Sequence, residues 1–205
     1  MDETTGESPP LGRRERNKLE KLTRIHRAAA ELIDAHGIAA VTTQQVAEQA
    51  DVAAGTLFQY VASKSELLLM VLNQRFAEAV AVGWADQGGE VGLRPRLTAL
   101  LQPVVACNRQ QTENGRAYLL EVAFGDPAER HRAEATAIVD ELTSHVEQVL
   151  IDTGAASADD AHDSARVVFA VFYYALSDTA GARSEPASVM ADIDRQLATH
   201  FPEWT

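Results

Sequence analysis

Apolar residues recur three or four positions apart along most of the chain, which is the spacing of one face of an α-helix. In the first such segment, from about Arg16 to His36, this face consists of Leu22, Ile25, Ala29, Leu32 and Ile33. Further helices are predicted from Ser63 to Val80, from Pro95 past Pro103, from Gly115 to Phe124, from Asp126 to Leu150, from Ser157 to Leu176 and from Ser184 to His200. No strand-like alternation of useful length occurs between them, so the pattern predicts an all-α protein of about nine helices.

Two of these helices are short and lie close together near the amino end. Thr42 and Gln45 stand in capping-box arrangement, which predicts a helix from Thr43 to about Ala50. Asp51 then occupies a turn that requires left-handed backbone angles, at a cost of up to about 1–2 kcal/mol relative to glycine. A second short helix follows, to about residue 60. Such a pair is typical of a helix-turn-helix, whose second helix enters the DNA major groove.

Side-chain size supports a close crossing of these two helices. Ala47 is small where the backbones would approach, and Val46, Val52 and Leu57 are expected to fill the core between them. A second capping box, Ser63 and Glu66, starts the longer helix that follows. The glycine-rich segment 83–92 is predicted to be a loop.

Charge is distributed unevenly. The chain has a formal net charge of −12, yet residues 13–27 carry seven basic residues against two acidic ones. Positive charge gathered at one end is what a local phosphate-binding surface needs. The alternative is a solvated basic helix face without a partner.

The segment from the helix pair into "TLFQYVASKSELL", preceded by one basic amphipathic helix, resembles the DNA-binding domain of the TetR family, the tetracycline-repressor-like regulators. The resemblance covers about residues 16–76; beyond it, only the number and length of the helices agree. Asp51 stands where the family often has glycine, Ala53 where it often has serine, Phe58 where it often has tyrosine and Val61 where it often has phenylalanine.

The resemblance implies a set of DNA contacts. Thr43, Gln44, Tyr60 and Lys64 are then the expected backbone contacts, and Phe58 replaces a tyrosine whose hydroxyl touches phosphate in relatives. Ala53, Ala54 and Gly55 open the second helix with almost no side chain, so its backbone can come close to the DNA. Reading bases falls to Thr56 and Gln59, because glutamine pairs bidentately with adenine and the threonine methyl meets that of thymine. Tyr60 as a half-buried packing residue and Thr42 as a plain cap are the alternatives.

The expected organisation has three parts: a disordered tail (1–15), a helix-turn-helix domain (16–62) and a ligand-binding and dimerisation domain (63–205). The helix at 165–176 is apolar nearly all round. By resemblance it pairs with the final helix in a homodimer that reads a palindromic operator, two recognition helices about 34 Å apart. A central helix in a monomer core is the alternative.

A ligand pocket is implied among the middle helices. Its candidate residues are Val104, Cys107, Tyr118, Glu121, Val122, Phe172 and Tyr173. Each apolar member has ordinary core packing as its alternative, and Glu121 either meets a cationic ligand or pairs with an arginine. Trp84 is expected as a lid or a loop anchor. The effector itself is not identified by the sequence.

The rival classes are an enzyme and a helical small-molecule-binding or adaptor protein without DNA binding. No H-x-x-x-H pair, glycine-rich phosphate loop or G-x-S-x-G turn is present, and Cys107 alone cannot form a zinc–thiolate site. We therefore predict a ligand-responsive DNA-binding regulator that needs no cofactor or metal and is not an enzyme. The resemblance implies a repressor, because most members of the family are repressors. The single cysteine and the absence of a long apolar run favour the cytoplasm and no membrane partner.

Overall fold

The structure is a computed structural model, and it describes residues 12–178, 185–202 and 204. These residues contain helices and turns without a strand, so the predicted all-α class is confirmed. The nine helices among them are α1 (Arg13–Ala40), α2 (Thr43–Gln49), α3 (Ala54–Leu57), α4 (Lys64–Gln87), α5 (Leu93–Arg109), α6 (Thr112–Phe124), α7 (Arg130–Asp152), α8 (Ala161–Ser177) and α9 (Pro186–Leu197).

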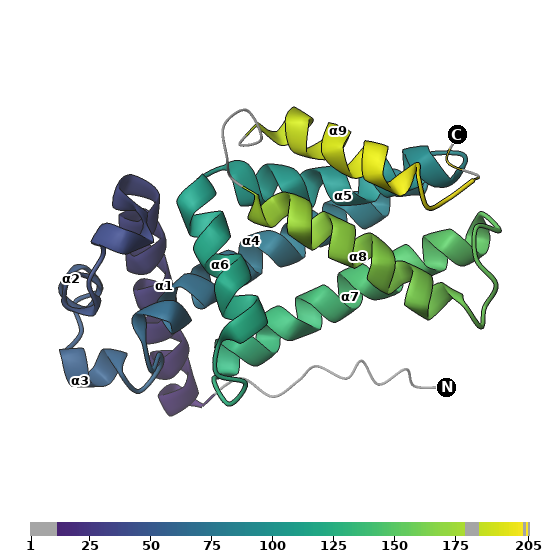
Figure 1. Cartoon of the computed structure of the whole chain (residues 1–205). Helices are drawn as coiled ribbons and strands as arrows, with labels where there is room; N and C mark the ends of the chain where they lie inside the picture. Colours follow the sequence, from purple (N-terminus) through teal and green to yellow (C-terminus); the bar gives the residue numbers. More distant parts are fainter. Residues whose placement is uncertain (1–11, 179–184, 203, 205) are drawn as a thin grey trace, which may run out of the picture.

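The helices form two groups joined by α4. In Figure 1, α1 to α3 lie together at one end of the molecule, and α5 to α9 surround the far part of α4 at the other. Helix α4 packs against α1 on one side and chiefly against α5 and α7 on the other. The apolar core is continuous along it, from Ile25 in α1 to Phe172 in α8.

Most helix boundaries agree with the sequence pattern to within a few residues. Gly37 interrupts α1 with a φ of 73°, as expected of a stop residue. The helix begins at Arg13, inside the segment expected to be a tail; the rest of that tail, residues 1–11, and the predicted start at Ser184 lie outside the described residues. Helix α8 begins at Ala161 instead of Ser157, because Ser157 caps a preceding turn by accepting the N–H of Asp160.

The loop predicted at residues 83–92 is wrong in its first half. Helix α4 continues to Gln87, and only residues 88–92 connect it to α5. A Cβ on Gly83 would lie 2.2 Å from the carbonyl oxygen of Leu100 in α5. Gly83 is therefore a close-packing position between two helices, and its small size was misread as a sign of a loop.

Helix α4 is long and apolar enough, by length and composition alone, to cross a membrane. Of the described residues it is the one helix that meets this criterion, and 61% of its apolar window is buried inside the protein. Its buried residues include Leu67, Leu69 and Val71. The apolar composition of α4 is accounted for by its central place in the core.

Candidate nucleic-acid interface and effector cavity

The predicted helix-turn-helix forms between α2 and α3. The oxygen of Thr42 accepts the N–H of Gln45 at 3.2 Å and the Gln45 side chain accepts the N–H of Thr42 at 2.8 Å, which completes the first capping box. Val46 and Leu57 are fully buried between the helices, with Val52 packed beside them. The expected small core is confirmed.

Asp51 adopts the left-handed conformation that its position requires, with a φ of 52°. The guanidinium of Arg24 in α1 lies 3.4 Å from the Asp51 carboxylate. This ion pair is exposed and is worth at most about 1 kcal/mol. It offsets part of the backbone strain and ties the turn to α1.

Helix α3 is shorter than predicted. It covers one turn and has no side-chain cap at Ala53, and hydrogen-bonded turns carry the chain on to Val61. On this segment Gly55, Phe58 and Gln59 are exposed, and Thr56 is partly exposed. A Cβ added to Gly55 would meet no atom within 4 Å. The protein fold therefore does not require glycine there.

The flanking candidates differ in exposure. Gln44 is exposed and donates to Glu48, whereas Thr43 and Tyr60 are partly buried, with Tyr60 packed against the core. Lys64 occupies the first turn of α4, as expected. Its ammonium donates to the carbonyl of Ala39 at 2.8 Å, so it also closes the end of α1.

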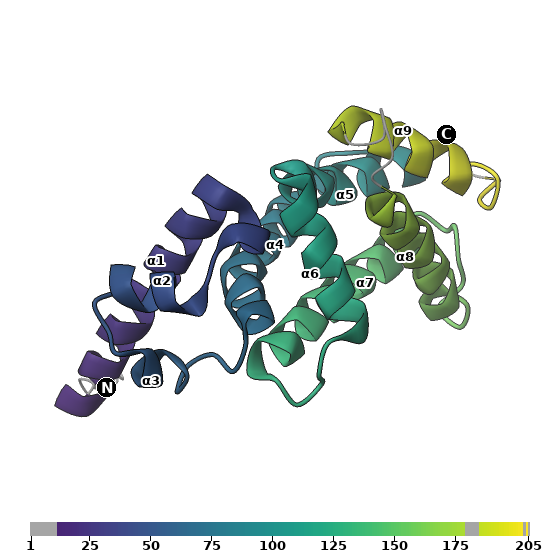
Figure 2. The ribbon, with the colours of Figure 1, turned by 60° about the vertical axis from the view of Figure 1, so that its left-hand side comes forward.

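The first turns of α1 carry the positive charge. Five cations there are exposed and have no ion-pair partner within the part of the chain that the structure describes: Arg13, Arg14, Arg16, Lys18 and Lys21. In Figure 2 the amino end of α1 and α3 lie at the same end of the molecule, so the cations flank the helix-turn-helix. This is the charge arrangement of a phosphate-binding surface.

The second domain contains a small apolar cavity between α4, α5, α6, α7 and α8. Its volume is about 40 Å³, close to the space of one water molecule. Five of the predicted ligand residues line it: Val104, Tyr118, Val122, Phe172 and Tyr173. Phe76 of α4 stacks on Tyr118 across it, with ring centroids 4.3 Å apart. Sequence reasoning missed Phe76, although it belongs to the apolar face of α4.

The other two predicted ligand residues do not line this cavity. Cys107 lies in a separate polar pocket beside Asp34 and Arg75. Burial raises the pKa of its thiol to about 11, in keeping with the inert thiol expected as the alternative to a nucleophile. Glu121 turns toward the start of α4, where it accepts a hydrogen bond from Ser65 at 2.5 Å.

Trp84 is neither a lid nor a loop anchor. It lies in α4 and stacks on His145 of α7, with centroids 4.1 Å apart. Burial lowers the pKa of His145, because the protonated ring would lose hydration.

Buried polar groups join α4 to the wall of the cavity. The Tyr118 hydroxyl donates to Asn73 at 3.0 Å, and the Asn73 amide donates to the His131 carbonyl at 2.8 Å. The N–H of His131 donates in turn to Glu66 at 2.7 Å. Ser63 caps α4 as predicted, but Glu66 caps the start of α7 instead of closing a second capping box. These hydrogen bonds fix the positions of α4, α6 and α7 relative to one another.

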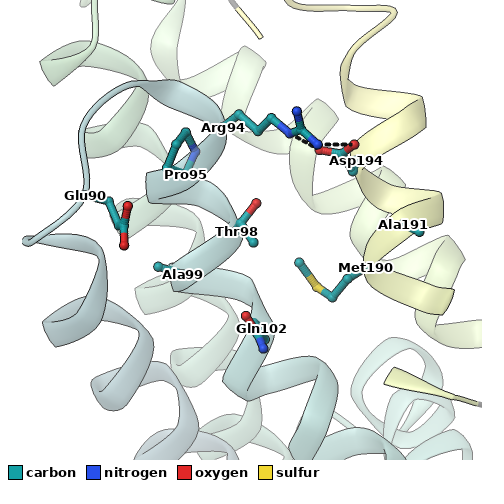
Figure 3. A pocket seen from close by; sticks show the side chains of 9 residues that line it. All are labelled: Glu90, Arg94, Pro95, Thr98, Ala99, Gln102, Met190, Ala191 and Asp194. Carbon is teal, nitrogen blue, oxygen red and sulfur yellow. Dashed lines mark hydrogen bonds and ion pairs between the residues drawn. The ribbon is translucent and has the colours of Figure 1, made fainter. Parts of the chain in front are cut away.

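An open groove of about 600 Å³ lies between α5 and α9 (Figure 3). Arg94 and Asp194 close one end through paired hydrogen bonds of 2.6 and 3.1 Å. Glu90, Thr98 and Gln102 add polar side chains to a wall that also contains Pro95 and Met190, and the groove is open to solvent. The groove lacks the enclosed apolar lining that is typical of small-molecule sites. Within the described residues, no group of histidine, cysteine, aspartate and glutamate is arranged to hold a metal ion.

The fold and the exposed helix pair define a helix-turn-helix regulator with a separate helical domain. Residues 25–71 match the family model of bacterial regulatory proteins, tetR family. This match confirms the resemblance to the TetR family of transcriptional regulators over the DNA-binding segment. The partners that this resemblance implies are an operator in DNA and an effector ligand.

Solved structures agree with this fold. Thermus thermophilus FadR, a repressor solved with lauroyl-CoA, is 20% identical with a TM-score of 0.67, covering 86% of this chain and 91% of its own. A TetR regulator from Rhodococcus sp. RHA1 is 17% identical with a TM-score of 0.66, covering 89% and 96%. Bacillus subtilis FadR, solved with stearoyl-CoA, is 15% identical with a TM-score of 0.58, covering 84% and 97%. At these identities the likeness extends to the fold alone, and no curated protein matches the chain.

Proposed function

We propose that the protein is a cytoplasmic homodimeric repressor that binds a palindromic operator through α3 and leaves it when an apolar effector occupies the cavity of the second domain. One observation carries the DNA-binding part. Gly55 of α3 faces open space, since a Cβ added there would meet no atom within 4 Å, and the unpaired cations of α1 flank the helix. A short helix with small exposed side chains, flanked by positive charge, can approach a groove of duplex DNA closely.

In this proposal the DNA-binding unit ends at residue 62, and the effector and dimer unit begins at Ser63. Thr56 and Gln59 read base edges, and Ala54 and Gly55 let the backbone approach. Positioning on phosphates falls to Thr43, Gln44, Phe58, Tyr60 and Lys64. Lys64 has a double role, because its ammonium already holds the carbonyl of Ala39 in α1.

The dimer is proposed through α8 and α9. These helices lie side by side on an outer face of the second domain (Figure 1). Two large apolar residues of α8 are exposed, Val167 at 42% and Tyr174 at 63%, and they are seven positions apart, on one side of the helix. Exposed apolar surface on a helix otherwise packed in the core is typical of an interface. A second copy would bury it and bring two α3 helices to one operator.

The effector is proposed to carry an apolar chain. The cavity wall is almost entirely hydrocarbon and aromatic, and its volume of about 40 Å³ is far below that of an occupied ligand site. An effector must therefore push α6 and α8 away from α4 to enter. The lauroyl-CoA and stearoyl-CoA bound by the two FadR proteins are consistent with a chain-like occupant.

Helix α4 is the proposed link between the two sites. It carries Lys64 beside the helix-turn-helix and Phe76 in the cavity wall, and α1 packs directly on it. An effector shifts the equilibrium only by the difference in its affinity for the two arrangements. A tilt of α4 that admits the effector would also separate the recognition helices.

Selection of bound duplexes from random DNA, followed by titration of the selected site at several salt concentrations, tests the proposal. Gln59→Ala is expected to relax preference at one base pair of each half-site and to cost about 1–3 kcal/mol of binding free energy. Lys64→Ala is expected to weaken binding to all sequences and to reduce the salt slope by about 1.

Gln74→Ala, an exposed glutamine of α4 far from α3, is the matched control and is expected to bind as the wild type does. Losses of the same kind from Gln59→Ala and Lys64→Ala would contradict the assigned roles. An unshifted random pool at low salt would favour the alternative of an adaptor that does not bind DNA.

A further inference from the structure

A second pocket lies where the two domains meet, next to the apolar cavity. Its volume is about 390 Å³, and its wall combines residues of α1, α4, α5 and the start of α6. The polar residues that matter to its chemistry are Asp34, Arg75, Gln111 and Asn114. Unlike the apolar cavity, it has room for a polar group without rearrangement.

Three polar contacts that hold α1 against the second domain converge on this pocket. Arg75 of α4 donates two hydrogen bonds to the Asp34 carboxylate, at 2.8 and 2.7 Å. Gln111 donates to the backbone carbonyl of Asp34 at 2.7 Å, and Asn114 accepts the N–H of Ile38 at 2.8 Å. A ligand in this pocket would therefore touch the groups that fix the DNA-binding domain in place.

The pocket and the apolar cavity share one wall, the side chain of Phe76. Arg75 and Phe76 are adjacent in α4, so the guanidinium faces the polar pocket and the ring faces both spaces. A molecule whose chain fills the cavity and passes the Phe76 ring has its other end beside Arg75. The two spaces together fit a molecule with an apolar chain and a polar head.

We propose that the polar pocket binds the anionic head group of an amphiphilic effector, which takes the place of the Asp34 carboxylate on Arg75. This inference rests on the proposed function, since the chain of the effector is assigned to the apolar cavity. It adds the charge of the head group and the contact through which binding reaches the DNA-binding domain.

The geometry favours an anionic head over a cationic one. Arg75 belongs to α4, which also forms the cavity wall, whereas Asp34 belongs to α1. A ligand held in the cavity keeps Arg75 within reach as the domains separate, but it loses Asp34. The planar guanidinium binds a carboxylate or phosphate with two parallel hydrogen bonds, the same geometry that it now makes with Asp34.

The exchange couples the two sites. Each head group bound to Arg75 removes the ion pair between α1 and α4, so the DNA-binding domain is held less tightly in its present position. By thermodynamic linkage, a protein fixed on its operator binds the anionic head more weakly by the same factor. Asp34 acts in this scheme as a built-in competitor of the effector.

The test compares probes with the same chain and different heads: dodecanoate, dodecanol and lauroyl-CoA, titrated into the full-length protein by calorimetry and by release of operator DNA. Dodecanoate is expected to bind about tenfold more tightly than dodecanol, which reflects one charge-assisted pair. Arg75→Gln is expected to remove this difference and to leave dodecanol affinity unchanged. Asp34→Asn is expected to enlarge the difference, because the competitor is lost.

Arg94→Gln is the matched control, since it breaks another bidentate arginine–aspartate pair, in the groove between α5 and α9. It is expected to keep the wild-type preference. The double variant Asp34→Asn with Arg75→Gln removes both charges. It is the control for a loss of stability that either single variant causes by leaving one charge unpaired. Thermal unfolding of each variant is compared with the wild type.

The outcomes separate the two proposals. Equal binding of dodecanol, dodecanoate and lauroyl-CoA, or a preference for an anionic head that survives Arg75→Gln, overturns the head-group site and leaves the apolar cavity intact. Failure of all three probes to bind overturns the effector cavity and the head-group site with it. If lauroyl-CoA alone binds more tightly than dodecanol, the pocket binds a phosphate head. If dodecanoate also binds more tightly than dodecanol, the pocket binds a carboxylate head.

Discussion

Gly55→Ala separates what the fold needs from what DNA binding needs. Gly55 is exposed on α3, its φ is not in the left-handed region, and a Cβ added there would meet no atom within 4 Å. The substitution adds one methyl group to a helix that tolerates it. Every cost that appears must then come from a partner outside the chain.

Gly55→Ala is expected to stabilise the fold and to weaken DNA binding. Alanine in place of glycine in a helix raises the free energy of unfolding by roughly 0.5–1 kcal/mol, through helix propensity and a less flexible unfolded chain. On DNA the methyl group holds the α3 backbone away from the groove, which lengthens the contacts of Thr56 and Gln59. Each base contact is worth about 1–3 kcal/mol, so affinity is expected to fall by about ten- to a hundredfold.

The assay pairs urea unfolding with titration of the selected operator at fixed salt. Gly83→Ala is the contrasting control, because its Cβ would lie 2.2 Å from the Leu100 carbonyl oxygen. That variant is expected to lose stability by about 1–3 kcal/mol through overpacking. If Gly55→Ala bound the operator as tightly as the wild type, the close approach of α3 to DNA would be refuted.

Three further predictions concern the second domain and the domain junction. Cys107, whose pKa is raised to about 11 by burial, is expected to be alkylated at pH 8 about a hundredfold more slowly than in the denatured chain, measured by mass spectrometry. Burial and the charge of Arg75 lower the pKa of His26 in the folded protein, so near pH 6.5 the imidazole is protonated in the unfolded chain only. The urea midpoint of unfolding is therefore expected to fall as the pH drops through about 6.5, and to fall less in His26→Gln. Tyr174→Asp is expected to give a monomer by light scattering and to lose palindrome binding, whereas Val82→Asp, on α4 and 50% exposed against 63% for Tyr174, should remain a dimer.

Local signals in the sequence were enough to predict the helix-turn-helix. A capping box is made by residues three positions apart, and the left-handed turn at Asp51 follows from the spacing of two short helices. Both depend on neighbours in the chain, so they need no knowledge of tertiary structure. The glycines at 83–92 failed as a signal because the role of Gly83 is set by Leu100 on another helix.

The proposed effector site was only half predictable for the same reason. Tyr118 and Val122 lie one helical turn apart, so the apolar face of α6 could be recognised, and both line the cavity. Glu121 precedes Val122 in α6, so its side chain points about 100° away from that of Val122, toward Ser65 of α4. The partner of a polar side chain is fixed by packing, and no periodicity in the sequence reveals it.

The structure also explains why the domain junction, rather than the cavity alone, is suited to switching. An apolar contact between α1 and α4 loses its stabilising effect only when surface is exposed to water. In the ion pair, by contrast, Arg75 can change partners while the half-exposed carboxylate of Asp34 is left to water. Arg75 can pass from Asp34 to a ligand and remain paired throughout. Of the polar contacts at this pocket, the neutral hydrogen bonds of Gln111 and Asn114 to α1 then remain. Each is worth about 0.5–1.5 kcal/mol net, which is small enough for a ligand's differential affinity to overcome.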